Sequence, residues 1–342
     1  MEVGIIGAPQ SGKTTLFTAI TGVNPGHEVG KKAVVKIPDE RLEYLTQIFK
    51  PKKQVNATIN FIDAPPPQSM DTKRGSSSSA FLNFVKQVDA IITVCACFKD
   101  GGFKELEDMI EILILTDLEV VEGILGKEKK LTIDPKYAGP TPETLKKLAD
   151  GLGNGKMVKD IELNDKEKET LRGVQLFTKI PIFAVLNTNE KGGTEEEKKA
   201  SAFLDPLGIP HIAVCATVEA DIALLPPEER STFLEEYGIK EPALNRVIRE
   251  VFDLLGYHTF FTAGEDETRA WTIRKGDNAV TAAGKIHTDI AKGFIRAECC
   301  TWEDFQACDS SLKVAKERGK LRLEGKEYIV HDGEITHFRH SG

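Results

Sequence analysis

Three polar side chains have the types and the spacing to hold a phosphate group together with a metal ion. Lys13 and Thr14 end the octapeptide GAPQSGKT, residues 7–14, which fits the pattern G-x-x-x-x-G-K-[ST] in full. In this pattern the lysine reaches the β- and γ-phosphates of a nucleoside triphosphate, and the hydroxyl is a ligand of Mg²⁺. Asp63 ends a later apolar stretch, where a carboxylate can hold Mg²⁺ through water. We expect Lys13 and Asp63 to be catalytic groups and Thr14 and Asp63 to be metal ligands; the alternative for Asp63 is a helix or turn cap.

The residues around the octapeptide supply the elements that would position these groups. The apolar run at residues 3–6 is typical of a buried parallel strand, and apolar residues at helical spacing follow at residues 16–20. Gly7 and Gly12 let backbone N–H groups turn inward around an anion, at the positive end of the new helix. The residues expected to bind the nucleotide here are Gly7, Gln10, Ser11, Gly12, Lys13, Thr14 and Thr15. The alternative is an ordinary glycine turn between a strand and a helix.

A second group of candidates follows the apolar stretch at residues 181–186. Asn187, Thr188 and Glu190 stand where GTP-binding proteins carry N-K-x-D, so the lysine and the aspartate of that motif are both replaced. The aspartate of the motif pairs with guanine N1–H and the 2-amino group, which adenine lacks. We therefore expect these three residues to bind a nucleotide whose base is adenine, with residues 216–217 in the loop that cradles it. The alternative is a capped loop that touches no base.

The two segments that normally sense the γ-phosphate are altered. No threonine occurs between Thr21 and Thr46, although a threonine of the first switch usually closes over Mg²⁺. Pro66 replaces the glycine of D-x-x-G, and proline has no N–H to donate to a phosphate. The polar stretch at residues 68–79 is either an unstructured surface loop or a second switch. These changes favour nucleotide binding over hydrolysis, because the glycine loop and Lys13 supply most phosphate contacts.

Composition limits the class of protein. The 342 residues suggest about two domains, and 40% hydrophobic with 29% charged residues is typical of a soluble protein. The net charge of −8 argues against indiscriminate binding to nucleic acid or to an anionic membrane, and we expect no sequence-specific DNA partner. No apolar run approaches the roughly 20 residues that span a bilayer. The absence of a signal sequence and six scattered cysteines predict a reduced, cytoplasmic protein.

The periodicity predicts an α/β fold, a sheet with helices on both faces that is interrupted by a helical insertion. Strands are expected near residues 33–37, 57–62 and 211–215, and residues 85–94 are expected to be a helix end followed by a strand. Helices are expected from residues 38–39 to just before Pro51 and at 232–255. Helical spacing over residues 103–178 predicts an inserted hairpin. A small mixed C-terminal region is expected to have strands at 259–262, 269–273, 295–299, 328–330 and 335–338 and helices at 280–292 and 311–318. The predicted domains are residues 1–102 with 179–257, residues 103–178, and residues 258–342.

Other chemistry-bearing residues lie outside these motifs. Cys95 and Cys97 share one face of a strand, which favours core thiols over a metal site. Trp271, with Arg269 and Arg274 nearby, either stacks on an RNA base or packs in the core. The C-terminal cysteines are either a redox-sensitive group or plain thiols: Cys299, Cys300 and Cys308.

Taken together, the motifs resemble the YchF-type Obg-like ATPases over essentially the whole chain. The resemblance rests on the glycine loop, the N-x-x-E loop, the helical insertion and four C-terminal strings. These strings are FFTAG (260–264), RAWTIRKG (269–276), HTD (287–289) and KGFIRA (292–297). It implies a TRAFAC-class P-loop domain, a coiled-coil-like insertion and a C-terminal TGS domain of β-grasp fold. It also implies ATP hydrolysis in preference to GTP, with Mg²⁺, and association with the ribosome or its large subunit.

The resemblance implies contacts as well. Residues 10–15 would meet the phosphates, and Thr188 would contact adenine through its backbone. The altered switch residues depart from the family pattern and predict slow or partner-dependent hydrolysis. Two function classes remain: an ATPase whose cycle gates binding to a translation partner, or a nucleotide-loaded adaptor with little or no hydrolysis.

Overall fold

The computed structural model describes residues 1–24, 26, 30–64, 81, 83, 84, 87–127, 139–236 and 241–341. Pro66 and the stretch at 68–79, for which a second switch was considered, lie outside the described residues. Contacts divide the chain into two compact units, residues 1–34 with 60–244 and residues 35–59 with 245–342. Each unit is built around one six-stranded sheet, although two strands of the first sheet run across the dividing points.

The first sheet places its strands in the order β2-β4-β1-β5-β6-β7. Its members are β1 (Glu2–Gly7), β2 (Lys32–Lys36), β4 (Thr58–Asp63), β5 (Ala90–Ala96), β6 (Ile182–Asn187) and β7 (His211–Val214). The strands from β4 to β7 in this order pair in parallel, and β5 and β6 are buried along their whole length. Parallel strands buried on both faces read as continuous apolar runs, as these do. Their carboxyl ends therefore meet at one edge of the sheet.

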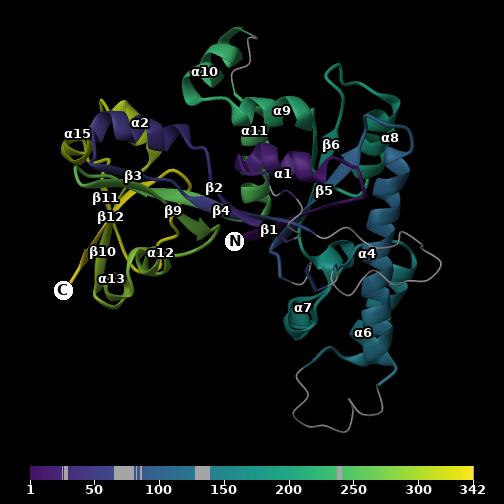
Figure 1. Cartoon of the computed structure of the whole chain (residues 1–342). Helices are drawn as coiled ribbons and strands as arrows, with labels where there is room; N and C mark the ends of the chain where they lie inside the picture. The colour runs from purple at the N-terminus through teal and green to yellow at the C-terminus, as the bar shows by residue number, and fades with distance from the viewer. Residues whose placement is uncertain are drawn as a thin grey trace. The chain divides into compact units, whose positions relative to one another are not determined.

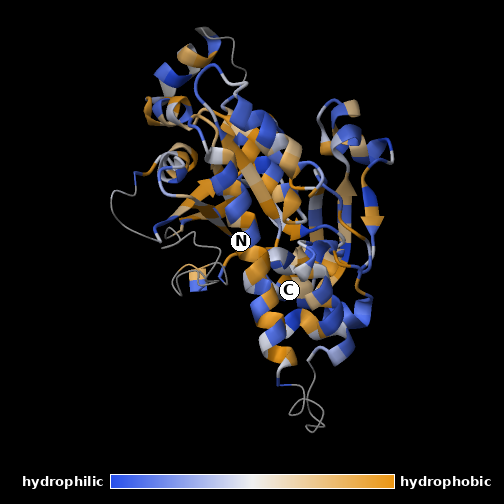
Figure 2. Ribbon diagram, turned by 90° about the vertical axis from the view of Figure 1, so that its right-hand side faces the viewer, coloured by the Kyte–Doolittle hydropathy of each residue, from blue (hydrophilic) through white to orange (hydrophobic). Residues whose placement is uncertain are grey.

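Helices cover both faces of this sheet (Figure 1), so the predicted α/β class is confirmed. They are α1 (Lys13–Thr21), α4 (Gly102–Leu125), α6 (Pro142–Gly153), α7 (Asp165–Thr170), α8 (Glu195–Leu204), α9 (Ala216–Leu224) and α10 (Pro227–Glu236), with short 3₁₀ turns at Val158–Asp160, Leu171–Gly173 and Phe177–Lys179. The long helix α4 packs against α6, and both share one hydrophobic core with β1 and β5. In Figure 2 strands are coloured largely as hydrophobic, whereas the helices carry both hydrophobic and hydrophilic residues.

A buried carboxylate fixes the 3₁₀ turn at Phe177–Lys179 to helix α4. Asp117 is fully buried and accepts hydrogen bonds from the backbone N–H of Phe177 at 2.6 Å and of Thr178 at 2.8 Å. The Thr178 hydroxyl also donates to it at 2.6 Å. Burial raises the pKa of Asp117, and these hydrogen bonds oppose that shift. The carboxylate thus satisfies N–H groups that the short turn cannot pair internally.

The second sheet has the order β11-β10-β12-β8-β9-β3. Its strands are β3 (Lys53–Val55), β8 (Tyr257–Thr262), β9 (Glu267–Arg274), β10 (Phe294–Cys300), β11 (Arg322–Glu324) and β12 (Ile335–His340). The helices are α2 (Glu40–Phe49), α11 (Ala243–Leu254), α12 (Ala279–Ile286), α13 (Thr288–Lys292), α14 (Trp302–Ala307) and α15 (Leu312–Glu317). A hairpin of β8 and β9 precedes helix α12, and β12 returns parallel to β8. This is the β-grasp arrangement that the resemblance implies.

Several elements differ from the expectation. The closing helix is two helices, α10 and α11, and Pro242 before α11 is a residue that cannot continue a helix interior. The helix expected at 280–292 breaks at His287, whose extended backbone lets its ring accept from the N–H of Asp289 and start α13. Residues 216–217 are the first turn of α9, not a loop. In the stretch 328–330 the structure has an isolated bridge between Asn278 and Ile329 in place of a strand.

The division into units also differs from the predicted domains. Residues 35–59 were expected with the glycine loop, but they fold with the C-terminal sheet because β3 pairs in parallel with β9. Helices α4 and α6, expected as a separate insertion, share the core of the first sheet. Within the described residues, none of the helices has both the length and the apolar character needed to cross a bilayer.

Candidate nucleotide site

The glycine loop between β1 and α1 adopts a backbone that few residue types allow. Gln10 has φ 61° and Gly12 has φ 88°, both in the left-handed region. A Cβ on Gly12 would also overlap the side-chain amide of Asn187, and one on Gly7 would lie 2.5 Å from the Ser11 hydroxyl. Both glycines are therefore required by close approach, and Gly12 by its conformation as well. Gly12 caps α1 without a side chain, so the first N–H groups of the helix have no side-chain acceptor from the cap.

Lys13, Thr14 and Asp63 lie together at the carboxyl end of β4. Lys13 Nζ donates to Asp63 Oδ1 at 2.7 Å and also to the carbonyl oxygen of Ala64. Thr14 Oγ1 donates to the other carboxylate oxygen, Oδ2, at 3.4 Å. The Lys13 and Asp63 side chains are only 12% and 8% exposed, so this ion pair is nearly buried. The structure thus brings together the three groups that the sequence singled out.

Asn187 connects the glycine loop to helix α9. Its Nδ2 donates to the carbonyl oxygen of Ser11 at 3.0 Å, and its Oδ1 accepts from the N–H of Ala216 at 3.0 Å. Thr188 is buried, and its N–H donates to the carbonyl oxygen of Val214 at 2.9 Å. Two consecutive residues at the end of β6 therefore fix the glycine loop against the segment after β7.

A pocket of about 740 Å³ adjoins the loop. Residues from the loop, from α1, from the end of β6 and the segments after β5 and β6, and from the start of α9 line it: Gln10, Gly12, Thr15, Phe98, Asn187, Thr188, Asn189, Glu190, Lys191, Cys215 and Thr217. Of the predicted nucleotide-binding residues, Gly7, Ser11, Lys13 and Thr14 are not in this lining. The pocket accordingly lies on the side of the loop where the predicted base-binding residues gather.

Sequence reasoning missed four residues of this lining: Phe98, Asn189, Lys191 and Cys215. Phe98 follows β5, and its large aromatic side chain is 43% exposed. The signal was available, because β5 lies between β1 and β6 and its carboxyl end must share their edge of the sheet. A flat aromatic side chain at this place offers a surface on which a base can stack.

The donor set fits a magnesium ion. Thr14 supplies a hydroxyl oxygen and Asp63 a carboxylate oxygen, and Mg²⁺ prefers oxygen ligands while keeping several waters. In the part of the chain that the structure describes, no group of three or more His, Cys, Asp or Glu side chains could hold a metal. Besides Thr14 and Asp63, phosphate and water are ligands that such a cation accepts.

The remaining candidates are occupied by contacts within the protein. Cys95 and Cys97 are buried with their Sγ atoms 3.5 Å apart, and the hydrogen bond to Cys97, together with burial, raises the pKa of Cys95. Burial raises the pKa of Cys299 to about 12 and of Cys300 to about 11, which opposes thiolate reactivity. The Trp271 ring packs against the core of the second sheet, and the guanidinium of Arg269 lies 3.9 Å from its centroid.

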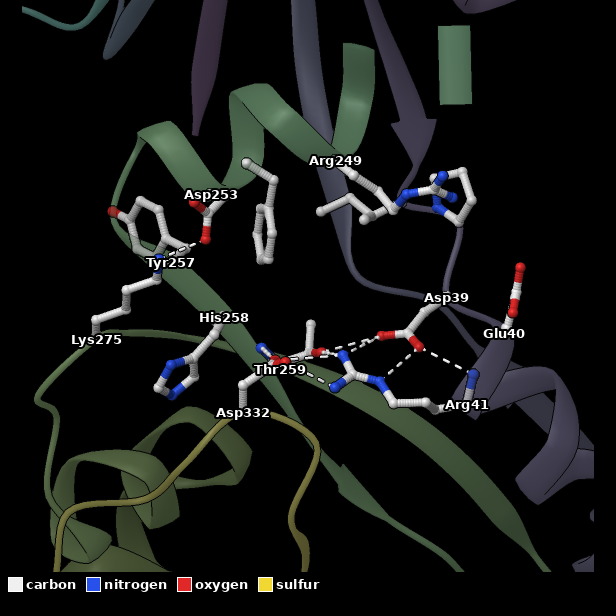
Figure 3. A pocket seen from close by; sticks show the side chains of 13 residues that line it. Asp39, Glu40, Arg41, Arg249, Asp253, Tyr257, His258, Thr259, Lys275 and Asp332 are labelled. Atoms are coloured by element: carbon white, nitrogen blue, oxygen red, sulfur yellow. Dashed lines mark hydrogen bonds and ion pairs between the residues drawn. The ribbon is translucent and has the colours of Figure 1, made fainter. Parts of the chain in front are cut away.

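A second pocket, of about 560 Å³, lies within the second unit and has a different character (Figure 3). Arg41 donates from Nη1 to Asp332 Oδ2 at 2.7 Å and from Nε to Asp39 Oδ1 at 2.9 Å. Lys275 pairs with Asp253 at its other side. None of the predicted site residues lines this pocket, and these charged side chains pair with each other.

Comparison with known proteins gives matches along the whole chain. A family model named YchF-GTPase_C, described as a protein of unknown function, matches residues 257–341, and one described as 50S ribosome-binding GTPase matches residues 2–125. The "Ribosome-binding ATPase YchF" of Bacillus subtilis is 37% identical, covering 99% of this chain and 99% of that protein. The protein of the same name from Escherichia coli O157:H7 is 37% identical over 98% of each chain.

Solved structures give the same result. The YchF GTPase of Schizosaccharomyces pombe superposes with a TM-score of 0.85 at 27% identity, covering 99% of this chain and 97% of that one. A GTP binding protein from Pyrococcus horikoshii OT3 matches with a TM-score of 0.64 at 17% identity, over 100% of both chains, and so shows the fold alone.

Proposed function

The chain belongs to the YchF family, as its motifs indicated, and we propose that it is a Mg²⁺-dependent nucleotide hydrolase that binds ATP in preference to GTP. One observation carries the proposal: Lys13, Thr14 and Asp63 meet at the glycine loop, beside a pocket of about 740 Å³. The loop N–H groups and Lys13 bind the phosphates, and Thr14 and Asp63 hold the cation. A bound Mg²⁺ supplies charge neutralisation of the phosphate oxygens.

The preference for adenine rests on the loop after β6. Glu190 and Thr188 line the pocket where the guanine-binding motif has Asp and Lys. A site that is built to hydrogen-bond one base can discriminate against another by a factor of about 10⁴ or more. Loss of the Asp and Lys of the guanine-binding motif therefore removes the penalty against adenine. Phe98 offers its exposed ring to the base, and Thr188 offers its backbone.

Hydrolysis by the isolated protein is slow in this proposal. Pro66 has no N–H where a γ-phosphate donor is expected, and removing one such donor from an active site costs about 10²–10³ in rate. The first switch lacks its metal-closing threonine as well. Lys13 and Asp63 remain as the catalytic groups. Fast turnover then requires a partner that supplies the missing contacts to the γ-phosphate and the cation.

The partner proposed here is the ribosome, through its large subunit. The curated relatives are named ribosome-binding ATPases, and the family model over residues 2–125 is described as a 50S ribosome-binding GTPase. Such a partner implies a cytoplasmic protein. We assign residues 258–342 as the TGS domain on the same resemblance, and residues 103–178 as the helical insertion.

Competition between ATP and GTP for a fluorescent ATP analogue, combined with turnover with and without ribosomes, tests the proposal. ATP should displace the analogue at lower concentration than GTP, and ribosomes should raise turnover. Lys13→Ala serves as the control for turnover that does not come from this site. Equal or tighter binding of GTP, or fast ATP turnover without a partner, would contradict the proposal. A Glu190→Asp variant should shift the preference toward GTP.

A second candidate function is a nucleotide-loaded adaptor that does not hydrolyse. The replacement of the D-x-x-G glycine by Pro66 favours it, since the change affects hydrolysis more than binding. Stoichiometric ATP binding, with turnover equal to that of Lys13→Ala in the presence of ribosomes, would select the adaptor.

A further inference from the structure

The ion pair of Lys13 and Asp63 joins two groups that have separate tasks in the proposed function. Lys13 is assigned to the phosphates and Asp63 to the cation, yet Nζ lies 2.7 Å from Asp63 Oδ1. The ammonium also donates to the Ala64 carbonyl oxygen. An ammonium has three N–H donors, so these two contacts leave one for a phosphate oxygen.

Asp63 also places a negative charge where phosphates would arrive. Its side chain is 8% exposed and that of Lys13 is 12% exposed, so water screens neither group well. A nucleotide without a metal ion is a polyanion, and it meets a lysine whose charge a carboxylate already neutralises. A metal–nucleotide complex brings its own cation, which competes with the ammonium for the same carboxylate.

Thr14 links the two arrangements. Its hydroxyl lies 3.4 Å from Asp63 Oδ2, on the carboxylate oxygen that Lys13 does not use. A cation held between Thr14 and Asp63 would thus bind the carboxylate oxygen that Lys13 does not use. Its charge would neutralise the carboxylate and so weaken the ion pair that holds Lys13.

We propose that Asp63 is a latch on Lys13, which holds the lysine away from the phosphates until a divalent cation takes the carboxylate. This inference rests on the proposed function and adds a regulation to the same site. Nucleotide capture then depends on the metal for two reasons, because the cation binds phosphate directly and also releases Lys13. Asp63 is in this respect a positioning residue for Lys13 as well as a metal ligand.

Binding of a fluorescent ATP analogue to the full-length protein, titrated in EDTA and again in MgCl₂, tests the latch. Asp63→Asn keeps the shape of the side chain and removes its charge. In EDTA this variant should bind the analogue about tenfold more tightly than wild type, the effect expected when one charge-assisted hydrogen bond becomes available. When EDTA is replaced by MgCl₂, the affinity of Asp63→Asn for the analogue should rise less than that of wild type, because a metal ligand has been weakened.

Two control variants separate the latch from other effects. Thr14→Val weakens the cation site but leaves the Lys13–Asp63 pair, so it should lose affinity in MgCl₂ and gain none in EDTA. Asp89→Asn removes the same charge from an exposed position in the first unit, and should leave both affinities unchanged. If Asp89→Asn also gained affinity in EDTA, net charge would explain the result and the latch would be refuted.

The outcomes also distinguish the latch from the proposed function. Wild type that fails to bind the analogue in either solution contradicts the proposed function. Wild type that binds in MgCl₂, with Asp63→Asn no tighter than wild type in EDTA, overturns the latch alone. Far-UV circular dichroism checks the fold of each variant, and Asp63→Ala repeats the test if the asparagine variant does not fold.

Discussion

A charged pair lies in one of the two pockets described above and beside the other, but the pairs differ in what else their members could bind. In the second unit Arg41 is surrounded by Asp39 and Asp332, and the Thr259 hydroxyl also donates to Asp39 (Figure 3). At the glycine loop, the described residues give Lys13 one carboxylate partner, in a loop whose backbone is left-handed at Gln10 and Gly12. The difference shows that an ion pair in a pocket is not by itself a binding site. The surrounding backbone decides which pair can be exchanged for a ligand.

The largest effect is expected from Lys13→Met. The change removes charge-assisted hydrogen bonds to the phosphates, worth about 1.5–3 kcal/mol each, so affinity for ATP should fall by about 100-fold. Titration with a fluorescent ATP analogue in MgCl₂ measures it. Affinity within a few-fold of wild type would show that the glycine loop binds phosphate without its lysine.

Arg41→Met should destabilise the second unit by about 2–3 kcal/mol. Breaking a buried ion pair costs about 3–5 kcal/mol, and the value is lower here because the Asp332 side chain is 51% exposed. The chain has two tryptophans, Trp271 and Trp302, which both lie in the second unit. Tryptophan fluorescence during urea unfolding therefore reports this unit, and ATP affinity should not change. Loss of ATP binding by the folded variant would contradict the distinction between the pockets.

Lys275→Met is a matched change in the same pocket with a smaller expected effect. Lys275 and Asp253 are 50% and 69% exposed, and exposed ion pairs contribute about 0–1 kcal/mol. The urea midpoint from tryptophan fluorescence should shift much less than for Arg41→Met. Equal shifts of the urea midpoint for the two variants would mean that the number of partners and the burial of an ion pair do not determine its contribution to stability here.

The smallest effect is expected from pH. His258 lines the second pocket and is 9% exposed; burial lowers its pKa, while nearby Asp332 opposes the shift and Lys275 and His331 add to it. A lowered pKa means that the neutral ring contributes stability above the unfolded-state value of about 6.5, and that this stability is lost as pH falls below it. The urea midpoint of the second unit should fall between about pH 7 and pH 5. His258→Gln should flatten this dependence, and an unchanged slope would exclude His258 as its source.

The sequence predicted the glycine loop, Asp63 and the loop after β6 because each directly follows an apolar strand. Parallel strands end at one edge of a sheet, so local patterns were sufficient to bring Lys13 and Asp63 together. The fold of residues 35–59 could not be predicted in this way. The strand Lys53–Val55 has three residues and no distinguishing pattern, and its partner β9 lies more than 200 residues further along the chain. The pairing of Arg41 with Asp332 spans 291 positions and leaves no local signal either.

The assignment of residues 35–59 to the second unit has a consequence for dissecting the protein. These residues stand in the chain between Lys13 and Asp63, so a fragment that ends before residue 258 keeps β3 but loses its neighbour β9. The fragment would expose an unpaired strand edge, and Arg41 would lose one of its two carboxylates. Cutting this chain once, at any position, cannot release an intact nucleotide-binding half; such a piece requires a second excision, with residues 37–57 replaced by a short linker so that β2 and β4 stay whole.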